Sequence, residues 1–275
     1  MLKKFWERRL KRGRGREHWW RHRLGAGMWW GLARLLGAKT CRDPVFVVGS
    51  PHSGTSLILR ILGEHSAFYT VPYESQCAAS WALDVMCWKF NMLAWLNGRR
   101  RWLEKTPCHI RYLALLTDRF PEARFLIIIR DGRDVANSLK KRGRCSLEEG
   151  IDYWASTNRA GELFWNHPRV MKFTYEEFVA RTDATLKRIL DFLGEPFEEG
   201  LKNYHERPRA LYAADLNKPA SEKDGSHHDQ YRNWQINQPI FDGRGKWKKE
   251  LSTEELALIE QHAGEMLRAY GYPPE

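Results

Sequence analysis

The chain has 275 residues, of which 43% are hydrophobic and 13% aromatic, so it can bury a sizeable core and is not an intrinsically disordered chain. Its five cysteines are odd in number and lack CxxC spacing, which argues against a disulfide framework and a zinc ribbon and favours a reducing compartment. The formal charge of +11 comes from residues 1–42, where 13 Lys/Arg face two Glu, and the rest of the chain is balanced.

The first 42 residues form a basic arm that contains five tryptophans. Trp favours the headgroup layer and Lys/Arg favour anionic lipid, so we predict an arm that lies on a membrane surface. A surface-packed or partly disordered leader and an arm that binds phosphates are the alternatives, although no nucleic acid partner is expected. The apolar run 24–38 contains Arg34 and is too short to span a bilayer, and no signal peptide is convincing. We therefore expect a cytoplasmic protein, at most peripheral on the membrane, and not a secreted one.

From residue 43 to the C-terminus, short β-branched runs alternate with amphipathic stretches. This alternation predicts a single α/β domain, 43–275, with a parallel sheet and crossover helices. Strands are expected at 44–49, near 101–105, at 123–130 and, as an edge strand running into a turn, at 169–178. Helices are expected at 53–65, within 77–102, and at 108–120, 131–142, 147–165, 183–194 and 252–271. Residues 203–246 are polar and are expected to be irregular.

The loop after the first strand, "GSPHSGTS", has two glycines at the spacing of a phosphate-binding loop. Backbone amides at the start of the next helix, its dipole and the nearby hydroxyls predict an anion site. A loop for nucleoside triphosphates would have Lys where Thr55 stands, and no clear acidic metal partner accompanies this one. Metal-dependent triphosphate chemistry is therefore disfavoured, and no metal is predicted.

A second segment, "FLIIIRDGRDVANSL", puts Arg130 at the end of the strongest strand, where α/β ligand sites lie, and Ser138 two helical turns later. With "PVFVVGSPHSGTSLILRIL", it resembles the two signature segments of sulfotransferases that use 3′-phosphoadenosine 5′-phosphosulfate (PAPS) and release 3′-phosphoadenosine 5′-phosphate (PAP). "WLEKTP", "FTYEEFV", "ILDFLG" and "GRGKWKKELS" are similar to the bacterial and tyrosylprotein-type branch, so the resemblance covers 44 to about 270. It implies a P-loop-type, three-layer domain with a central parallel sheet flanked by helices.

The resemblance also implies which residues bind the nucleotide. The 5′-phosphate would be held by Ser53, Gly54, Thr55 and Ser56. The 3′-phosphate would be held by Arg130 and Ser138, and Tyr175 matches an aromatic position beside the nucleotide. In the late basic loop, Arg244, Lys246 and Lys248 are candidates for the 3′-phosphate and Trp247 for packing near the adenine, although a solvated basic face is the alternative.

For catalysis, the resemblance implies that Lys105 faces the transferring group and that Glu74 takes the acceptor proton, with His65 as the rival base. An exposed lysine paired with Glu104 is the alternative for Lys105. His52 departs from the family, which usually has Arg or Lys at this position. Either His52 is protonated beside the phosphates, or another cation, with Lys105 as the candidate, supplies the charge.

The implied reaction is in-line transfer of a sulfuryl group from PAPS to a hydroxyl acceptor, with a carboxylate base. The acceptor stays open between a glycan, a lipid, a peptide tyrosine and a small molecule. A P-loop kinase-like phosphotransferase and a non-catalytic PAP-binding protein at a membrane surface are the alternative functions.

Overall fold

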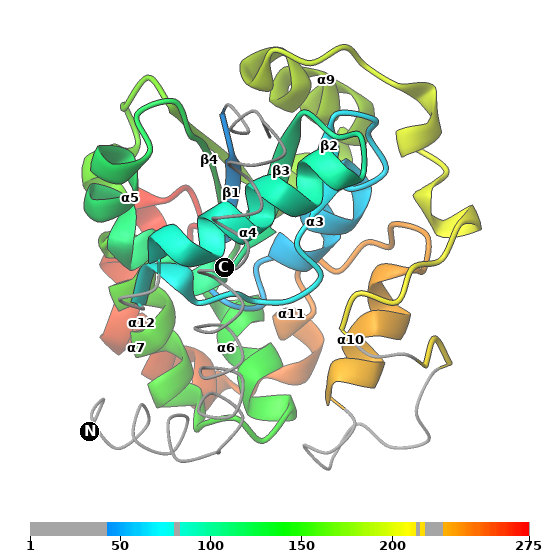
Figure 1. The fold of residues 1–275 in the computed structure, drawn as a ribbon. Coiled ribbons are helices and arrows are strands. Elements are labelled where there is room, and N and C mark those ends of the chain that lie inside the picture. Colours follow the sequence, from blue (N-terminus) through cyan, green and yellow to red (C-terminus); the bar gives the residue numbers. More distant parts are fainter. Residues whose placement is uncertain (1–42, 80–82, 213–214, 218–227, 275) are drawn as a thin grey trace.

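A computed structural model describes residues 43–79, 83–212, 215–217 and 228–274 (Figure 1). The predicted membrane-surface arm, 1–42, lies outside the described residues, as does part of the polar segment predicted to be irregular. Among the described helices, none is long and apolar enough to cross a bilayer.

Five parallel strands form one sheet in the order β2-β3-β1-β4-β5. They are β1 (Val45–Gly49), β2 (Phe68–Thr70), β3 (Arg101–Lys105), β4 (Arg124–Ile129) and β5 (Val170–Thr174). The central strand β1 is buried along its whole length, as is expected for a strand with helices on both faces of its sheet. Because all strands run in the same direction, their carboxyl ends meet at one edge, where α/β folds bind ligands.

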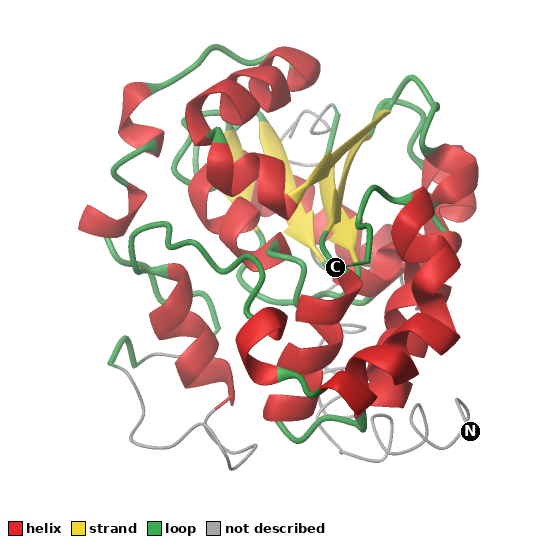
Figure 2. Ribbon diagram, turned by 180° about the vertical axis from the view of Figure 1, so that it is seen from behind, coloured by secondary structure: helices red, strands yellow, loops and turns green. Residues whose placement is uncertain are grey.

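Helices cover both faces of the sheet (Figures 1 and 2). One face packs on α3 (Thr55–Leu62), α8 (Tyr175–Ala180) and α9 (Thr182–Leu193). The other packs on α4 (Leu83–Leu96), α5 (Leu113–Arg119), α6 (Gly132–Lys141), α7 (Leu147–Arg159), α11 (Trp247–Glu250) and α12 (Thr253–Ala269). Alternate residues of β1 point to the two faces, with Val47 in the first core and Phe46 in the second. The predicted three-layer α/β fold is confirmed.

Short 3-10 turns and one further helix complete the described chain. They are η1 (Cys77–Ala79), η2 (Pro107–Tyr112), η3 (Glu162–Phe164), η4 (Glu199–Leu201), η5 (Tyr204–Glu206) and α10 (His228–Ile236).

The structure differs from the sequence prediction in three elements. The three-residue strand β2 was not predicted, because so short a run carries no clear periodicity. The edge strand β5 continues into α8 and not into a turn, because the Thr174 side chain caps that helix by accepting a hydrogen bond from the Glu177 amide (3.0 Å). Helix α10 lies in the segment predicted to be irregular.

Polar contacts hold α10 in place. This explains why the sequence shows no apolar stripe that would predict the helix. Asn233 accepts a hydrogen bond from the Leu211 amide (2.8 Å), and Asn237 accepts one from the Arg60 guanidinium (2.9 Å). Both asparagines are buried. A helix that packs through amide side chains has no hydrophobic period for a sequence reading to detect.

Candidate functional site

The loop between β1 and α3 has the shape that its glycines predict. Gly49 has φ 150°, and a Cβ there would lie 2.4 Å from the Ile128 carbonyl oxygen. Gly54 has φ 94°, and a Cβ there would lie 2.8 Å from the Tyr175 ring. Only glycine fits these close approaches, so the loop is held tightly against β4 and Tyr175.

Polar groups of the loop lack partners within the described part of the chain. The hydroxyls of Ser50 and Ser53 are buried and make no hydrogen bond there, and no side chain of that part caps α3. Thr55 and Ser56 begin this helix, so its first amides lie beside the loop. Buried polar groups are normally satisfied, so this arrangement suits an anion.

Arg130, at the carboxyl end of β4, joins the two signature segments. Its guanidinium lies over the Tyr175 ring (4.4 Å from the ring centroid) and donates to the carbonyls of His52 (3.1 Å) and Gly243 (2.6 Å). Asp134 lies 3.5 Å from the guanidinium, while the Arg130 Nε is buried without a described partner. The arginine is therefore held at the loop with one donor still unsatisfied.

His52 lies beside the predicted 3′-phosphate residues. Its Nδ1 is 2.8 Å from the Ser138 hydroxyl, and its backbone is left-handed, with φ 67°. In this arrangement the imidazole contacts Ser138, at the end of the site predicted for the 3′-phosphate. If a cation is needed beside Ser56, at the other end of the loop, a residue other than His52 must therefore supply it.

The late basic loop divides into exposed and buried residues. Arg244 is exposed and forms an ion pair with Asp242 (2.6 Å), and the Lys246 ammonium lies 5.1 Å from the Phe241 ring centroid. Trp247 is buried and donates its indole N–H to Asp131 (3.2 Å). Its ring is covered by the guanidinium of a further arginine at 3.9 Å, so Trp247 packs in the wall of this region.

That arginine, Arg133, has a structural role. It pairs with Asp131 (2.8 Å), whose carboxylate also accepts a hydrogen bond from the Arg133 amide and so caps α6. The helix expected at 131–142 thus begins with Asp131 as its N-cap.

Lys105, the last residue of β3, is buried and points to the end of the loop. Its Nζ donates to Glu74 Oε1 (2.7 Å) and lies 4.9 Å from the Tyr212 ring centroid. The alternative pairing with Glu104 does not occur, because that carboxylate instead contacts His109 (3.1 Å). The candidate base and the candidate cation are therefore brought into direct contact.

Arg232, on α10, also contacts Glu74. The sequence did not predict this residue as part of the site. Its Nη2 forms an ion pair with Glu74 Oε1, its Nε donates to the Ser56 hydroxyl (3.2 Å), and it stacks on Tyr212 at 3.7 Å. Burial alone would lower the pKa of Arg232, but the attraction of Glu74 outweighs burial and leaves this pKa above its ordinary value. No local motif marks Arg232, because its partners lie 158 and 176 residues away.

His65, the rival base, is a buried structural residue. Its Nε2 contacts the Pro196 carbonyl (2.8 Å), and its Nδ1 accepts a hydrogen bond from the Ala67 amide (3.0 Å). Both ring nitrogens are thus engaged by the backbone, which leaves neither of them to accept an acceptor's proton.

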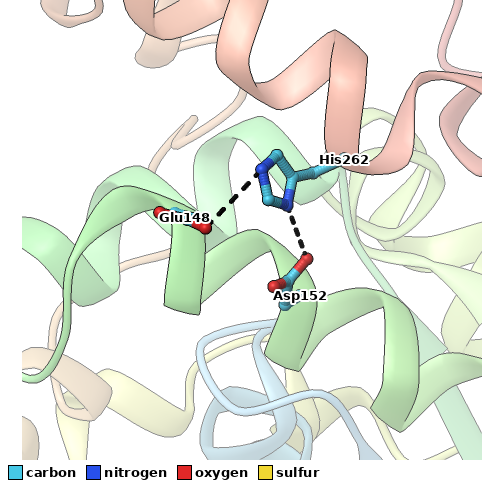
Figure 3. Close-up of side chains that lie close together, drawn as sticks. All are labelled: Glu148, Asp152 and His262. Carbon is cyan, nitrogen blue, oxygen red and sulfur yellow. Dashed lines mark hydrogen bonds and ion pairs between the residues drawn. The ribbon is translucent and has the colours of Figure 1, made fainter. Parts of the chain in front are cut away.

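A separate side-chain cluster joins α7 and α12 (Figure 3). Glu148, Asp152 and His262 have ligand-type atoms within 4.8 Å of one another. The two carboxylates contact different ring nitrogens, Asp152 at Nδ1 (3.0 Å) and Glu148 at Nε2 (3.7 Å). One ion can coordinate only one of these nitrogens, so the arrangement is that of an ion-pair clamp between the helices.

The sequence of this chain is similar to the sequences of known sulfotransferases. A profile of the sulfotransferase family matches residues 74–199. The chain is 23% identical over 268 residues to protein-tyrosine sulfotransferase A of Caenorhabditis elegans, covering 84% of this chain and 67% of that protein. It is 24% identical over 189 residues to the protein-tyrosine sulfotransferase of Drosophila melanogaster, covering 63% of this chain and 35% of that protein. The chain thus spans about two thirds of the first relative and about one third of the second.

Comparisons of structure agree on the fold. The sulfotransferase domain of the curacin biosynthetic pathway has a TM-score of 0.55 and 17% identity, covering 83% of this chain and 98% of that one. A mouse sulfotransferase complexed with PAP has a TM-score of 0.54 and 14% identity, covering 84% of this chain and 88% of that one. At these identities the similarity is one of fold.

Proposed function

Because residues 74–199 belong to the sulfotransferase family and the described fold is that of sulfotransferases, we propose that this protein transfers the sulfuryl group of PAPS to a hydroxyl acceptor. The observation that carries the proposal is the contact of Glu74 with the buried Lys105 at the end of the phosphate loop. A carboxylate and an ammonium there provide the base and the cation that this reaction needs.

In this proposal the loop binds the 5′-phosphosulfate of PAPS. Ser53, Gly54, Thr55 and Ser56 supply backbone amides and hydroxyls, as the unpartnered Ser53 hydroxyl suggests. Arg130 and Ser138 bind the 3′-phosphate. The unsatisfied Nε of Arg130 supports this role, since a guanidinium makes its strongest contacts with such an anion.

Other residues frame the nucleotide in the same proposal. Tyr175 packs between Gly54 and Arg130 and fixes the relative position of the two phosphate sites. Arg244 and Lys246 are exposed on the late loop, whose Gly243 carbonyl contacts Arg130, and they add positive charge beside the 3′-phosphate. His52, through its contact with Ser138, belongs to this end of the site.

The reaction would be a direct displacement at sulfur. The acceptor oxygen forms a bond to sulfur while the bond between sulfur and the 5′-phosphate oxygen breaks, and PAP leaves with that electron pair. The acceptor's proton goes to Glu74, and Lys105 stabilises the charge that builds on the leaving phosphate. No covalent intermediate on the enzyme and no metal ion are required in this scheme.

The acceptor is proposed only as a class. The two curated relatives named above are protein-tyrosine sulfotransferases, which makes a peptide tyrosine the first acceptor to test, before a glycan, a lipid or a small alcohol. If the predicted membrane arm is correct, lipid and glycolipid acceptors should be included in the test.

Two measurements test the proposal. Thermal unfolding of the full chain should shift upward with PAP and not with ATP and Mg²⁺, because a ligand that binds only the folded state stabilises it. Labelled PAPS should then transfer its sulfuryl group to a member of the acceptor panel, with the same rate in EDTA. Stabilisation by ATP and Mg²⁺ alone would favour the kinase alternative, and PAP binding without turnover of any acceptor would favour the non-catalytic one.

A further inference from the structure

Arg232 gives the candidate site a second buried cation whose role is so far unassigned. Its side chain is 16% exposed and comes from α10, whereas Lys105 comes from β3. Both cations contact the same carboxylate oxygen, Glu74 Oε1. The carboxylate of Asp229 also attracts Arg232, but Glu74 is the carboxylate that both cations contact.

The Arg232 guanidinium also touches the phosphate loop directly. Its Nε donates to the hydroxyl of Ser56, and Tyr212, which lies against the guanidinium, reaches the same hydroxyl with its own O–H (3.4 Å). Arg232 is therefore at the junction between the loop and Glu74. A guanidinium has a planar fork of donors that suits an anion with several oxygens, and it stays charged when buried.

The surroundings hold this guanidinium in place. Tyr212 stacks on one face of it, and Asn233, the next residue of α10, is bonded to the backbone just before Tyr212. Asn237 fastens the same helix to Arg60 of α3, the helix that begins at the loop. A side chain positioned by such contacts loses little freedom when a ligand arrives.

We propose that Arg232 binds the sulfuryl group of PAPS, and that Glu74 occupies this guanidinium when no donor is bound. The inference rests on the proposed function, because it needs PAPS as the donor. The inference also fits the position of His52. Because His52 contacts Ser138, the negative charge at the sulfuryl end of the loop must be neutralised by other cations.

The arrangement couples donor binding to the state of the base. When the sulfuryl oxygens take the donors of Arg232, Glu74 loses one of its two cationic partners and becomes available to an acceptor hydroxyl. Arg232 is then a group that touches the donor in the reaction, and Glu74 competes with the donor for it.

Titration calorimetry with PAPS and with PAP, in the absence of acceptor, separates the sulfuryl contact from the rest of nucleotide binding. Arg232→Ala should weaken PAPS binding about 10- to 100-fold, the effect of losing a charge-assisted hydrogen bond, and PAP binding by less than about 3-fold. Arg232→Lys should recover part of the loss, since it keeps the charge but not the fork. Arg268→Ala, which removes an ion pair with Glu260 on α12, is the matched control and should leave both affinities unchanged.

A second pair of variants guards against a misfolded Arg232→Ala protein. Glu74→Gln removes the competitor and should tighten PAPS binding, and the gain should shrink when Arg232→Lys is added. Unchanged PAPS affinity in Arg232→Ala, or an equal loss of PAPS and PAP, would overturn the inference while leaving the proposed function standing. If the wild-type chain binds neither nucleotide, the proposed function itself fails.

Discussion

Two cations, Lys105 and Arg232, contact the same oxygen of Glu74. Its side chain is partly exposed, so a hydroxyl acceptor can approach it, whereas Lys105 beside it is fully buried. This difference in exposure agrees with the proposed roles, in which Glu74 meets the acceptor and Lys105 the leaving group.

Glu74→Gln tests the assignment of the base. Turnover of PAPS with the acceptor found by screening should fall by about 10²- to 10⁴-fold, because the amide cannot take the proton. PAP affinity, measured by calorimetry, should stay within about 3-fold, since PAP has no sulfuryl group to compete for the cations. Glu122→Gln, an exposed carboxylate at the turn before β4, is the control and should be fully active. Full activity in Glu74→Gln would discard this base.

At the scale of elements, the phosphate loop and α10 are tied together by Arg60 of α3. This buried arginine donates to the carbonyls of Tyr204 (2.6 Å) and Arg207 (2.5 Å), and it pairs with Glu64 (2.6 Å). It also donates to Asn237, the residue that follows α10. Arg60, together with the contacts of Arg209 to Gly63 and Glu64, therefore ties the described parts of the chain around α10 to α3, and so helps to position Arg232.

Arg60→Met should destabilise the fold well beyond the loss of a surface ion pair. The methionine fills similar space but leaves two carbonyls without this donor, and the buried Glu64 carboxylate keeps Arg209 and Arg207 as partners. Breaking a buried pair in this way costs up to about 3–5 kcal/mol. Chemical denaturation should report that loss in the free energy of unfolding. Arg188→Met, which removes the exposed pair with Glu177, should cost less than about 1 kcal/mol. Equal effects of the two substitutions would contradict a tethering role for Arg60.

Elements with local signals were predictable from the sequence, and those held by distant contacts were not. β1 and β4 are continuous apolar runs and were expected as strands. The helices expected at 183–194 and 252–271 have local end signals, since Gly194 ends α9 in the left-handed conformation and Ser252 caps α12 through a capping box. α10 is fixed by asparagines bonded to residues more than 20 positions away. No window of the sequence contains both sides of such a contact, so neither α10 nor Arg232 could be placed.

For the whole molecule, charge is distributed very unevenly. The arm, 1–42, carries the entire formal excess of +11, so the domain itself is balanced. Within the domain, cations gather at the carboxyl edge of the sheet, where Arg130, Lys105 and Arg232 come from three different elements. The positive charge of the candidate site is therefore a product of the fold and not of net composition.

One buried charge pair makes the stability of the whole domain depend on pH. Glu104 and His109 are both fully buried, at the end of β3 and in η2, next to Lys105 and Cys77. Burial is the largest single effect and opposes the charge on each group, but the attraction between the two, together with hydrogen bonds from Thr106 and Ser75 to Glu104, outweighs it. The pKa of Glu104 therefore lies below its ordinary value of 4.5 and the pKa of His109 above its ordinary value of 6.5. Each group thus stabilises the folded state in its charged form.

The free energy of unfolding should reflect both shifts. The contribution of His109 is complete below pH 6.5 and is lost as pH rises from there through its folded pKa, while that of Glu104 is complete above pH 4.5 and is lost as pH falls from there through its folded pKa. The pair therefore contributes most between pH 4.5 and 6.5. Denaturation of wild type and His109→Gln from pH 5 to 9 should show a stability difference that shrinks as pH rises above about 6.5. A difference independent of pH would mean that the pKa of His109 is the same in the folded and unfolded protein, so that its charge adds nothing to stability.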